Sequence, residues 1–424
     1  MVRKWCLRAI AAYFLFGVVM YVYLFFLADT SIPDMYKGTS VDPTTFLNAR
    51  EMMLSEEYSK IRNLLFFLSS PYEWLFYYLV LIFGVSAAFE RWAGQASKWF
   101  PLKTAIYLFW LSLASFVFTF PLSYISYVFS RTYNISTQLF PSWMKDELID
   151  FWVSYATMFI LVLVLYSLMK KFKKKWWLAA WVLSVPYSIF MMFIQPVVID
   201  PLYNDFYPLK DKQLESKILL LANEADIPAE HVYEVDMSQK TNALNAYVTG
   251  VGSNSRIVLW DTTLERLDDE EVLFIMAHEM GHYVEKHIYF GIAGYTLLSF
   301  AGLWLTAKWM ERWVAKRGAV WKVESITNIS SLPVFLLIIS ILLFAVSPLT
   351  NWVSRYQEVR ADRYAIEMTQ DKDAAVRTFQ NLTKAGLSQV NPPYLVKIFR
   401  YGHPTMLERI RMMEEFEGDR DEEL

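Results

Sequence analysis

The run His278-Glu279-Met280-Gly281-His282 carries the residue types that a hydrolytic metal site needs. Because an α-helix repeats every 3.6 residues, side chains four apart lie on one face, so the two imidazoles can bind one ion. Glu279 follows the first histidine and can reach a water bound to that ion. Three protein ligands and one open position are typical of catalytic zinc, so the motif predicts a zinc-dependent hydrolase.

The third protein ligand has to come from another part of the chain. A metzincin would have Gly at position 285 and His at position 288; Glu285 and Ile288 stand there instead, which excludes that class. Glu358 and Asp362 are again four apart on a predicted helix, so one carboxylate can bind the ion while the other orients a ligand histidine. An exposed charged helix would show the same spacing, but the metal-binding motif elsewhere in the chain favours the metal site.

The overall composition is that of a membrane protein. Of 424 residues, 55% are hydrophobic and 20% are charged, whereas soluble domains average about 45 to 50% apolar and about 25% charged residues. The net charge of -3 provides no basic surface for nucleic acid. Cys6 is the only cysteine, so a metal ion must be bound by histidines and carboxylates. His287, five residues after His282, is expected to point to another helical face and to be structural.

Seven apolar stretches, uncharged except for Glu73 near the start of the second, are long enough, or nearly so, to span a membrane, since about 20 apolar residues cross the roughly 30 Å hydrocarbon layer. They are residues 9–28, 70–89, 104–130, 151–169, 176–199, 288–307 and 325–354. The first is longer than the apolar region of a signal peptide and six more follow it, so we expect it to be retained. The last carries Pro333 and Pro348 and is too long for one simple span.

Lys and Arg residues in the short loops predict the orientation, because these residues resist transfer across the membrane. Sixteen of them flank the spans on the side of the N-terminus, and five of these sixteen lie between Lys170 and Lys175. The opposite side has six. This bias predicts a cytoplasmic N-terminus. Seven crossings then place residues 200–287 and the tail from Arg355 on the extracytoplasmic side.

Two polar segments are expected to face water. Between 200 and 287 the pattern predicts a helix at 214–225 and strands at 231–236, 243–249 and 256–260, the last two as a hairpin. Asp268 followed by Glu271 predicts the start of the helix that carries the metal-binding motif. The segment from Arg355 onward is helical in pattern, with breaks at 386, 391–393 and 402–404, and it ends in an acidic tail.

Several motifs together resemble the zinc-dependent integral-membrane CAAX prenyl proteases. The shared motifs are the H-E-x-x-H helix, the E-x-x-x-D from Glu358 to Asp362, the Asn245-Ala-Tyr strand, the Pro-Leu-Tyr-Asn-Asp-Phe-Tyr-Pro-Leu run at 201–209 and the His403-Pro to Glu-Arg409 element. The fold of that family is a ring of seven helices around a large water-filled chamber, which the zinc domain caps. The chain looks like a bacterial relative.

The resemblance implies the roles of the residues around the metal. It makes His278, His282 and Glu358 the ligands of one zinc ion per chain. Glu279 would be the general base that activates the attacking water. Asp362 would hold a ligand histidine from outside the coordination sphere.

The resemblance also implies residues that contact the substrate. The strand of Asn245, Ala246 and Tyr247 would lie along the bound peptide. His403 would line the site and act in catalysis, and Arg409 would support the site from behind its ligands.

These features predict a mainly α-helical membrane protein whose seven transmembrane helices enclose a chamber, with a small α+β zinc metalloprotease domain. The predicted parts are 1–199 with five spans, 200–287 with the metal-binding helix, 288–354 with two spans, and 355–424 with Glu358 and the acidic tail. The predicted function is that of a membrane zinc metalloendopeptidase. It would act on a peptide or protein substrate, in contact with lipid and without nucleic acid.

Two other functions fit parts of the sequence. A quality-control protease of the HtpX type shares the zinc motif but usually has fewer spans. A catalytically inactive seven-helix binding protein would usually have lost Glu279 or a ligand, and all are present. Eukaryotic family members act on prenylated proteins at the cytosolic face, opposite to the side predicted here, so the resemblance does not by itself imply prenylated substrates.

Overall fold

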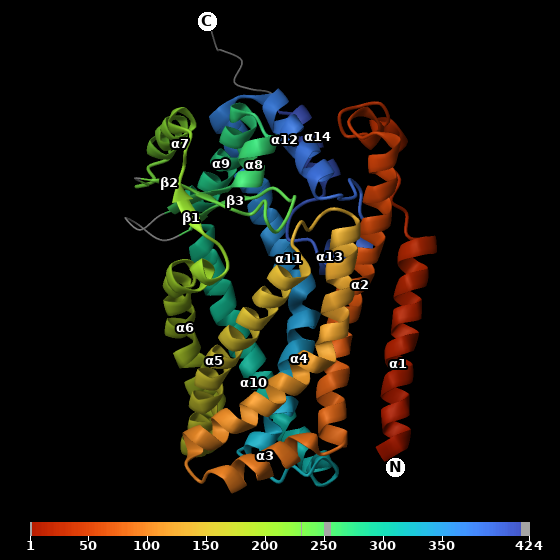
Figure 1. Ribbon diagram of the computed structural model, residues 1–424, viewed down its shortest axis with the longest axis vertical. Helices are drawn as coiled ribbons and strands as arrows, with labels where there is room; N and C mark the ends of the chain where they lie inside the picture. Colours follow the sequence, from red (N-terminus) through yellow and green to blue (C-terminus); the bar gives the residue numbers. More distant parts are fainter. Residues whose placement is uncertain (1, 230, 250–255, 417–424) are drawn as a thin grey trace, which may run out of the picture.

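The computed structural model describes residues 2–229, 231–249 and 256–416. A long bundle of helices carries a small domain at one end, and the N-terminus lies at the other end (Figure 1). The long helices are α1 (Val2–Val22), α2 (Ala49–Ile82), α4 (Phe100–Thr132), α5 (Phe140–Phe172), α6 (Trp176–Ile194), α10 (His287–Trp321) and α11 (Leu332–Thr369). The shorter α3 (Val85–Ala96) lies across the end of the bundle that is far from the small domain.

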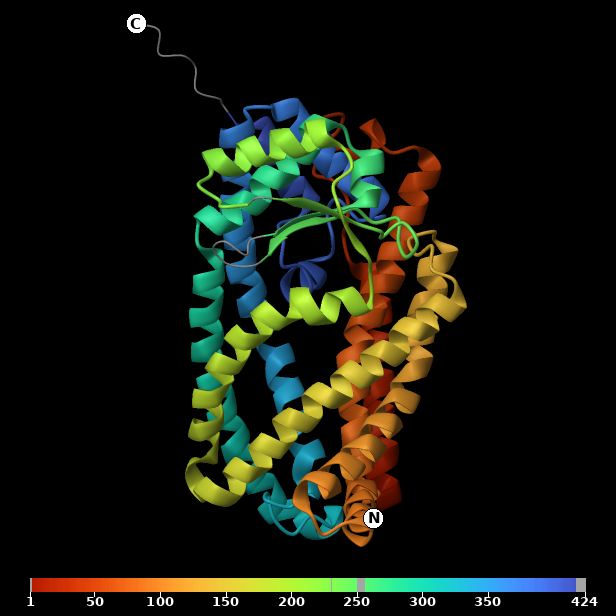
Figure 2. The same cartoon turned by 60° about the vertical axis from the view of Figure 1, so that its left-hand side comes forward.

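Six helical segments of the described residues are long and apolar enough to cross a membrane, where the sequence predicts seven spans. The stretches expected at 151–169 and 176–199 lie in one segment, residues 140–202, in which the short turn η4 (Lys173–Lys175) joins α5 to α6. Figure 2 shows these two helices meeting at the end far from the small domain. The chain is thus a multi-pass membrane protein, and the count of seven crossings stays a prediction.

The second span does not lie where the sequence predicts it. Instead of covering 70–89, α2 begins at Ala49 and ends at Ile82, with Pro71 inside it. Gly84 then takes a left-handed φ of 66°, and the chain turns into α3. The hydropathy pattern missed the first half of α2 because that half is polar, and a hydropathy window detects only the part of a helix that is suited to hydrocarbon.

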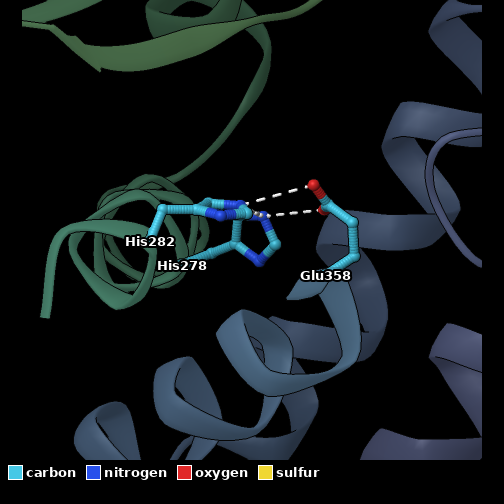
Figure 3. A group of neighbouring side chains, drawn as sticks. All are labelled: His278, His282 and Glu358. Carbon is cyan, nitrogen blue, oxygen red and sulfur yellow. Dashed lines mark hydrogen bonds and ion pairs between the residues drawn. The ribbon is translucent and has the colours of Figure 1, made fainter. Parts of the chain in front are cut away.

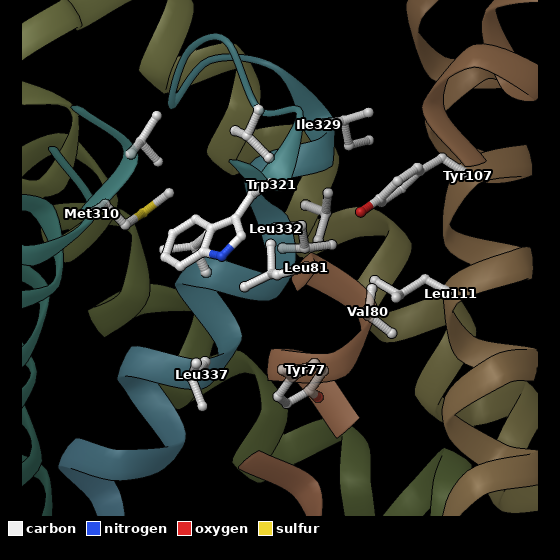
Figure 4. Close-up of a cluster of buried hydrophobic side chains, with 14 of the residues drawn as sticks. Tyr77, Val80, Leu81, Tyr107, Leu111, Met310, Trp321, Ile329, Leu332 and Leu337 are labelled. Atoms are coloured by element: carbon white, nitrogen blue, oxygen red, sulfur yellow. The ribbon is translucent and has the colours of Figure 1, made fainter. Parts of the chain in front are cut away.

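Buried side chains close the end of the bundle far from the small domain. Leu81 of α2, Tyr107 of α4, Trp321 of α10 and Leu332 of α11 belong to one cluster (Figure 4). Because lipid tails are as apolar as these side chains, close packing rather than exclusion of water holds this end together. Elsewhere the bundle is looser: in the most apolar stretch of α10 no residue is buried.

The small domain contains a four-stranded sheet in the order β1-β2-β4-β3. Its strands are β1 (Phe206–Pro208), β2 (Val232–Val235), β3 (Ala246–Thr249) and β4 (Arg256–Trp260). Antiparallel pairing of β3 with β4 confirms the predicted hairpin, whose loop, residues 250–255, lies outside the described residues. Since β2 runs parallel to β4 on its other side, β3 forms an edge of this sheet.

The helices of the small domain surround the sheet and the upper end of α11. They are α7 (Lys212–Glu224), α8 (Asp261–Arg266), α9 (Asp269–Val284), α12 (Lys372–Ala385), α13 (Tyr394–Phe399) and α14 (Met406–Glu414). The predicted helix at 214–225 corresponds to α7, and the predicted breaks at 386, 391–393 and 402–404 lie in the segments between α12, α13 and α14. One break was missed: α11 ends at Thr369, and the next residue, Gln370, has a positive φ of 52°.

Candidate metal centre

The helix that carries the metal-binding motif, α9, begins where the sequence predicts. Asp268 accepts a hydrogen bond from the backbone amide of Glu271, and the carboxylate of Glu271 accepts one from the amide of Asp268, which closes the first turn. Val272 and Met280 then pack in the apolar cluster of the sheet and α7, whereas Phe274 packs in that of α11 and α12. Packing on two sides fixes the rotation of α9, so that the motif histidines face α11.

Helices α9 and α11 approach closely at Gly281. A Cβ atom at this position would lie 3.1 Å from the Cα atom of Ala361 and 3.2 Å from the side chain of Tyr364. A larger residue would have to push the helices apart or displace these neighbours. The glycine therefore sets the distance between the histidines of α9 and Glu358 on α11.

Three side chains bring metal-binding atoms together between these helices (Figure 3). The Nε2 atoms of His278 and His282 are 3.2 Å apart. Glu358 places Oε2 3.2 Å from Nε2 of His278 and Oε1 3.4 Å from Nε2 of His282. Donor atoms on a tetrahedron with metal–ligand bonds of about 2.0–2.1 Å are separated by roughly 3.3–3.4 Å. The separation of the two nitrogens is close to such an edge, and each carboxylate oxygen of Glu358 lies at about that distance from one of the nitrogens, so the side chains fit an ion of the size of zinc.

Asp362 contacts the ring nitrogen of His278 that is not among the three clustered donor atoms, and Arg409 in turn contacts Asp362. Asp362 Oδ1 lies 2.7 Å from Nδ1 of His278, and Asp362 Oδ2 accepts a hydrogen bond of 2.8 Å from Nε of Arg409. Asp362 is fully buried. Burial lowers the pKa of His278, but the Asp362 carboxylate outweighs this effect and raises that pKa to about 9. A carboxylate on one ring nitrogen fixes the orientation of the imidazole and makes the other nitrogen a better metal ligand.

His287 contacts the second histidine of the motif, which the sequence did not lead us to expect. Its Nδ1 atom lies 2.8 Å from Nδ1 of His282. The expectation that His287 points to another face assumed one continuous helix, but α9 ends at Val284, and Lys286 has a positive φ of 56° before α10 begins. The turn brings His287 back to the site, where it orients His282. The only sequence signal was a third histidine within ten residues.

Glu279 lies beside the edge strand β3 and is not among the three donors. Its carboxylate accepts a hydrogen bond from the backbone amide of Val248, and burial raises its pKa. A carboxylate with a raised pKa exchanges protons closer to neutral pH, as a general base requires. On the other side of the centre, Nε2 of His403 lies 3.3 Å from Oε2 of Glu358, and the His403 side chain is 63% exposed. His403 therefore borders open space next to the clustered donors.

The residues expected along the substrate lie at β3. Ala246 and Tyr247 belong to this strand, and Asn245 precedes it with an exposed side chain whose Oδ1 accepts a hydrogen bond from the amide of Ala246. Tyr247 and Val248 line a cavity of about 660 Å³ between the sheet and the end of α6. The strand thus runs past Glu279 with a cavity at its side.

Comparison with known proteins identifies the family. The family model "Peptidase family M48" matches residues 208–417, and the model "CAAX prenyl protease N-terminal, five membrane helices" matches residues 26–205. The uncharacterized metalloprotease YhfN of Bacillus subtilis is 53% identical over 416 residues, which are 98% of each chain. This chain belongs to peptidase family M48.

More distant M48 relatives agree with this assignment. The CAAX prenyl protease 1 homolog of Arabidopsis thaliana is 31% identical over 55% of each chain, and CAAX prenyl protease 1 of Saccharomyces cerevisiae is 29% identical over 64% of this chain and 63% of its own. The crystal structure of S. mikatae Ste24p has the same fold, with a TM-score of 0.76, 23% identity, and coverage of 96% of this chain and 97% of that chain. The M48 protein described here is a membrane metalloprotease.

Proposed function

We propose that this M48 metalloprotease uses one zinc ion, held by His278, His282 and Glu358, to cut peptide bonds within a chamber of the helical bundle. The observation that carries the proposal is the clustering of three ligand side chains: the two imidazole nitrogens are 3.2 Å apart, and the two oxygens of Glu358 lie 3.2 and 3.4 Å from one nitrogen each. Asp362 and His287 support this assignment because each contacts the far nitrogen of one ligand histidine. Bound zinc would polarise the carbonyl of the substrate and lower the pKa of the attacking water to about 7.

The other residues of the site perform the proton transfers and hold the peptide. Glu279 accepts a proton from the attacking water and returns it to the leaving amine, a role that suits its raised pKa. An extended peptide can add to the outer edge of β3, where backbone pairing would align it with Glu279. The exposed imidazole of His403 can donate a hydrogen bond to the oxygen on which negative charge develops.

The match to the N-terminal model favours a CAAX prenyl protease-like enzyme over the HtpX-type alternative, because it covers the membrane helices outside the peptidase part. The presence of Glu279 and of the complete His-His-Glu cluster argues against an inactive binding protein. We further propose that the zinc domain is extracytoplasmic. The start of α1, α3, η4 and the end of α10 all lie at the end of the bundle far from the zinc domain, and these elements carry most of the sixteen cations that predict the cytoplasmic side (Figure 1).

An unbiased cleavage profile tests the proposed function. The purified protein is incubated in detergent with a library of peptides that carry no lipid, and the products are identified by mass spectrometry. We expect cleavage that a zinc chelator abolishes, that added zinc restores, and that Glu279→Gln lacks. Cleavage that persists in the chelator or in this variant would contradict the mechanism. If only prenylated peptides were cut, the substrate class would be that of the CAAX prenyl proteases.

A further inference from the structure

Two arginines lie next to each other in the wall of the bundle, near the segment that leads to the metal centre. Arg62 belongs to α2, and Arg400 follows α13. Arg400 donates a hydrogen bond to Oδ1 of Asn63, which is 1% exposed. Each guanidinium also lies over an aromatic ring, Arg62 at 5.4 Å from the centre of Tyr58 and Arg400 at 5.8 Å from that of Phe66. An aromatic face thus lies beside each of the two cations.

Neither arginine has an acidic partner among the residues that the structure describes. Within residues 2–229, 231–249 and 256–416, no carboxylate forms an ion pair with Arg62 or Arg400, and Nε of Arg62 and Nδ2 of Asn63 are buried without a hydrogen-bond partner. Burial, followed by repulsion from Arg62, lowers the pKa of Arg400 to about 10. Two adjacent, partly buried cations with unused hydrogen-bond donors destabilise the folded state when no anion neutralises them, because buried charges are normally paired. The pair therefore has the chemistry of an anion site.

The chain links this pair directly to the metal centre. Arg355, one turn before Glu358 on α11, donates hydrogen bonds to the carbonyl oxygens of Lys397 and Tyr401, which holds this segment along α11. Three residues after Arg400, His403 contacts Glu358. Since a chain extends at most about 3.6 Å per residue, the Cα atoms of Arg400 and His403 are within about 11 Å of each other. An extended peptide covers that distance in roughly three or four residues.

We propose that Arg62 and Arg400 bind a carboxylate of the peptide substrate, a few residues from the bond that is cut. The carboxylate is that of the C-terminus or of an acidic side chain, both of which match the planar fork of arginine. This proposal rests on the proposed peptidase function, which supplies a peptide at the metal centre. The pair would position the peptide relative to the metal and does not take part in the proton transfers.

A binding experiment tests the pair without requiring cleavage. The full-length Glu279→Gln variant in detergent is titrated into dye-labelled hexapeptides of mixed sequence that contain no acidic residues, with either a free C-terminal carboxylate or a C-terminal amide. A third pool has the amide and one glutamate. Fluorescence anisotropy gives the dissociation constants. We expect the free acid, or the glutamate pool, to bind roughly 10- to 100-fold more tightly than the neutral amide, and the pool that does so identifies the source of the carboxylate.

Variants of the pair separate this site from others that could bind a carboxylate. In Arg62→Gln and Arg400→Gln the preference should fall to less than about threefold, while neutral amides bind as before and the zinc content is unchanged. Arg400→Lys should keep part of the preference, because it keeps the charge and loses the fork. Arg50→Gln, at the exposed start of the same helix, is the matched control and should behave like the parent.

Three outcomes would overturn the proposal. The first is equal binding of all three peptide pools, or no binding of any. The second is a preference that persists in both Gln variants, as it would if the carboxylate bound the metal itself. The third is equal loss of binding for neutral and acidic peptides, which indicates a structural role. The proposed peptidase function is judged separately, by chelator-sensitive cleavage of the neutral peptides by the protein with Glu279 intact.

Discussion

At the scale of single residues, the proposed mechanism distinguishes side chains that would bind the ion from one that would move protons. Glu279 is held by the amide of Val248 and is not one of the three clustered donors. Replacing it with glutamine keeps the volume of the side chain and removes the proton acceptor. We expect Glu279→Gln to retain one zinc per chain, measured by metal analysis of the purified protein, and to lose at least about a hundredfold in cleavage rate. Unchanged activity in this variant would rule out the assigned role.

The two carboxylates of α11 should differ in what their loss does to the metal. Glu358→Ala removes one of the three donors, so both bound zinc and activity should fall. Asp362→Asn keeps the shape of the side chain but weakens its interaction with His278 and Arg409, so zinc affinity should fall by about 10- to 100-fold. Titration with a competing chelator measures both effects. Tightly held stoichiometric zinc in Glu358→Ala would mean that another residue is the third ligand.

The residues of the site differ in how far the sequence predicts them. The spacing of His278 and His282 identified a metal site because helix geometry alone puts both imidazoles on one face. Glu358 lies about 80 positions further along the chain. Its spacing from Asp362 suggested that one of the two carboxylates binds the metal, and only the resemblance to the CAAX prenyl proteases favoured Glu358. His287 was missed because the turn at Lys286 changes the direction of the chain. Arg62 and Arg400 were missed because their proximity depends on tertiary packing, for which spacing gives no signal.

At the scale of secondary structure, the crossing of α9 and α11 determines whether the donors meet. Gly281→Ala should improve the intrinsic helix propensity of α9 by about 1 kcal/mol, but the new methyl group would lie 3.1 Å from the Cα atom of Ala361. We expect the helices to separate slightly, so that zinc affinity falls more than thermal stability does. Gly294→Ala in α10 is the control, since a Cβ atom there has no neighbour within 4 Å. Equal zinc affinity in both variants would show that the crossing tolerates a wider separation.

The ends of helices and strands could be predicted where specific side chains in the sequence mark them. The capping box of Asp268 and Glu271 marks the start of α9, and the short apolar run that follows Arg256 marks β4. The boundaries of the long helices were not predictable from hydropathy, because α2 and α11 extend well beyond the apolar stretches within them. Their polar ends belong to the small domain and its surroundings. The same helices therefore connect the membrane bundle to the metal centre.

At the scale of the whole molecule, the exposure of the helices supports a hollow bundle. In the most apolar stretch of the 140–202 segment only 6% of residues are buried, and in the most apolar stretch of α10 none are, although these helices have neighbours within the bundle. A helical stretch that has neighbours and still buries almost nothing is what we expect of a helix with lipid on one side and a chamber on the other. The closed end at Leu81 and Trp321 and the small domain at the other end would bound that interior.

The side of the membrane that the small domain faces decides which substrates can reach it. Orienting the chain the other way would translocate sixteen cations of short loops instead of six, including the run from Lys170 to Lys175. The segment 200–287 has little influence, because it exceeds the roughly 60 residues over which the charge rule holds. We therefore expect the small domain to be extracytoplasmic, out of reach of proteins that are prenylated in the cytosol.

Single cysteines in a Cys6→Ser background test this orientation in intact cells. Ser216, exposed on α7 of the small domain, and Gln95, exposed at the end of α3, mark the two ends of the molecule. With a membrane-impermeant thiol reagent, Ser216→Cys should be labelled in intact cells and Gln95→Cys only after lysis. The reverse pattern would place the metal centre in the cytosol. Prenylated proteins would then be accessible substrates, and the positive charges near Lys170 would have to be explained by something other than topology.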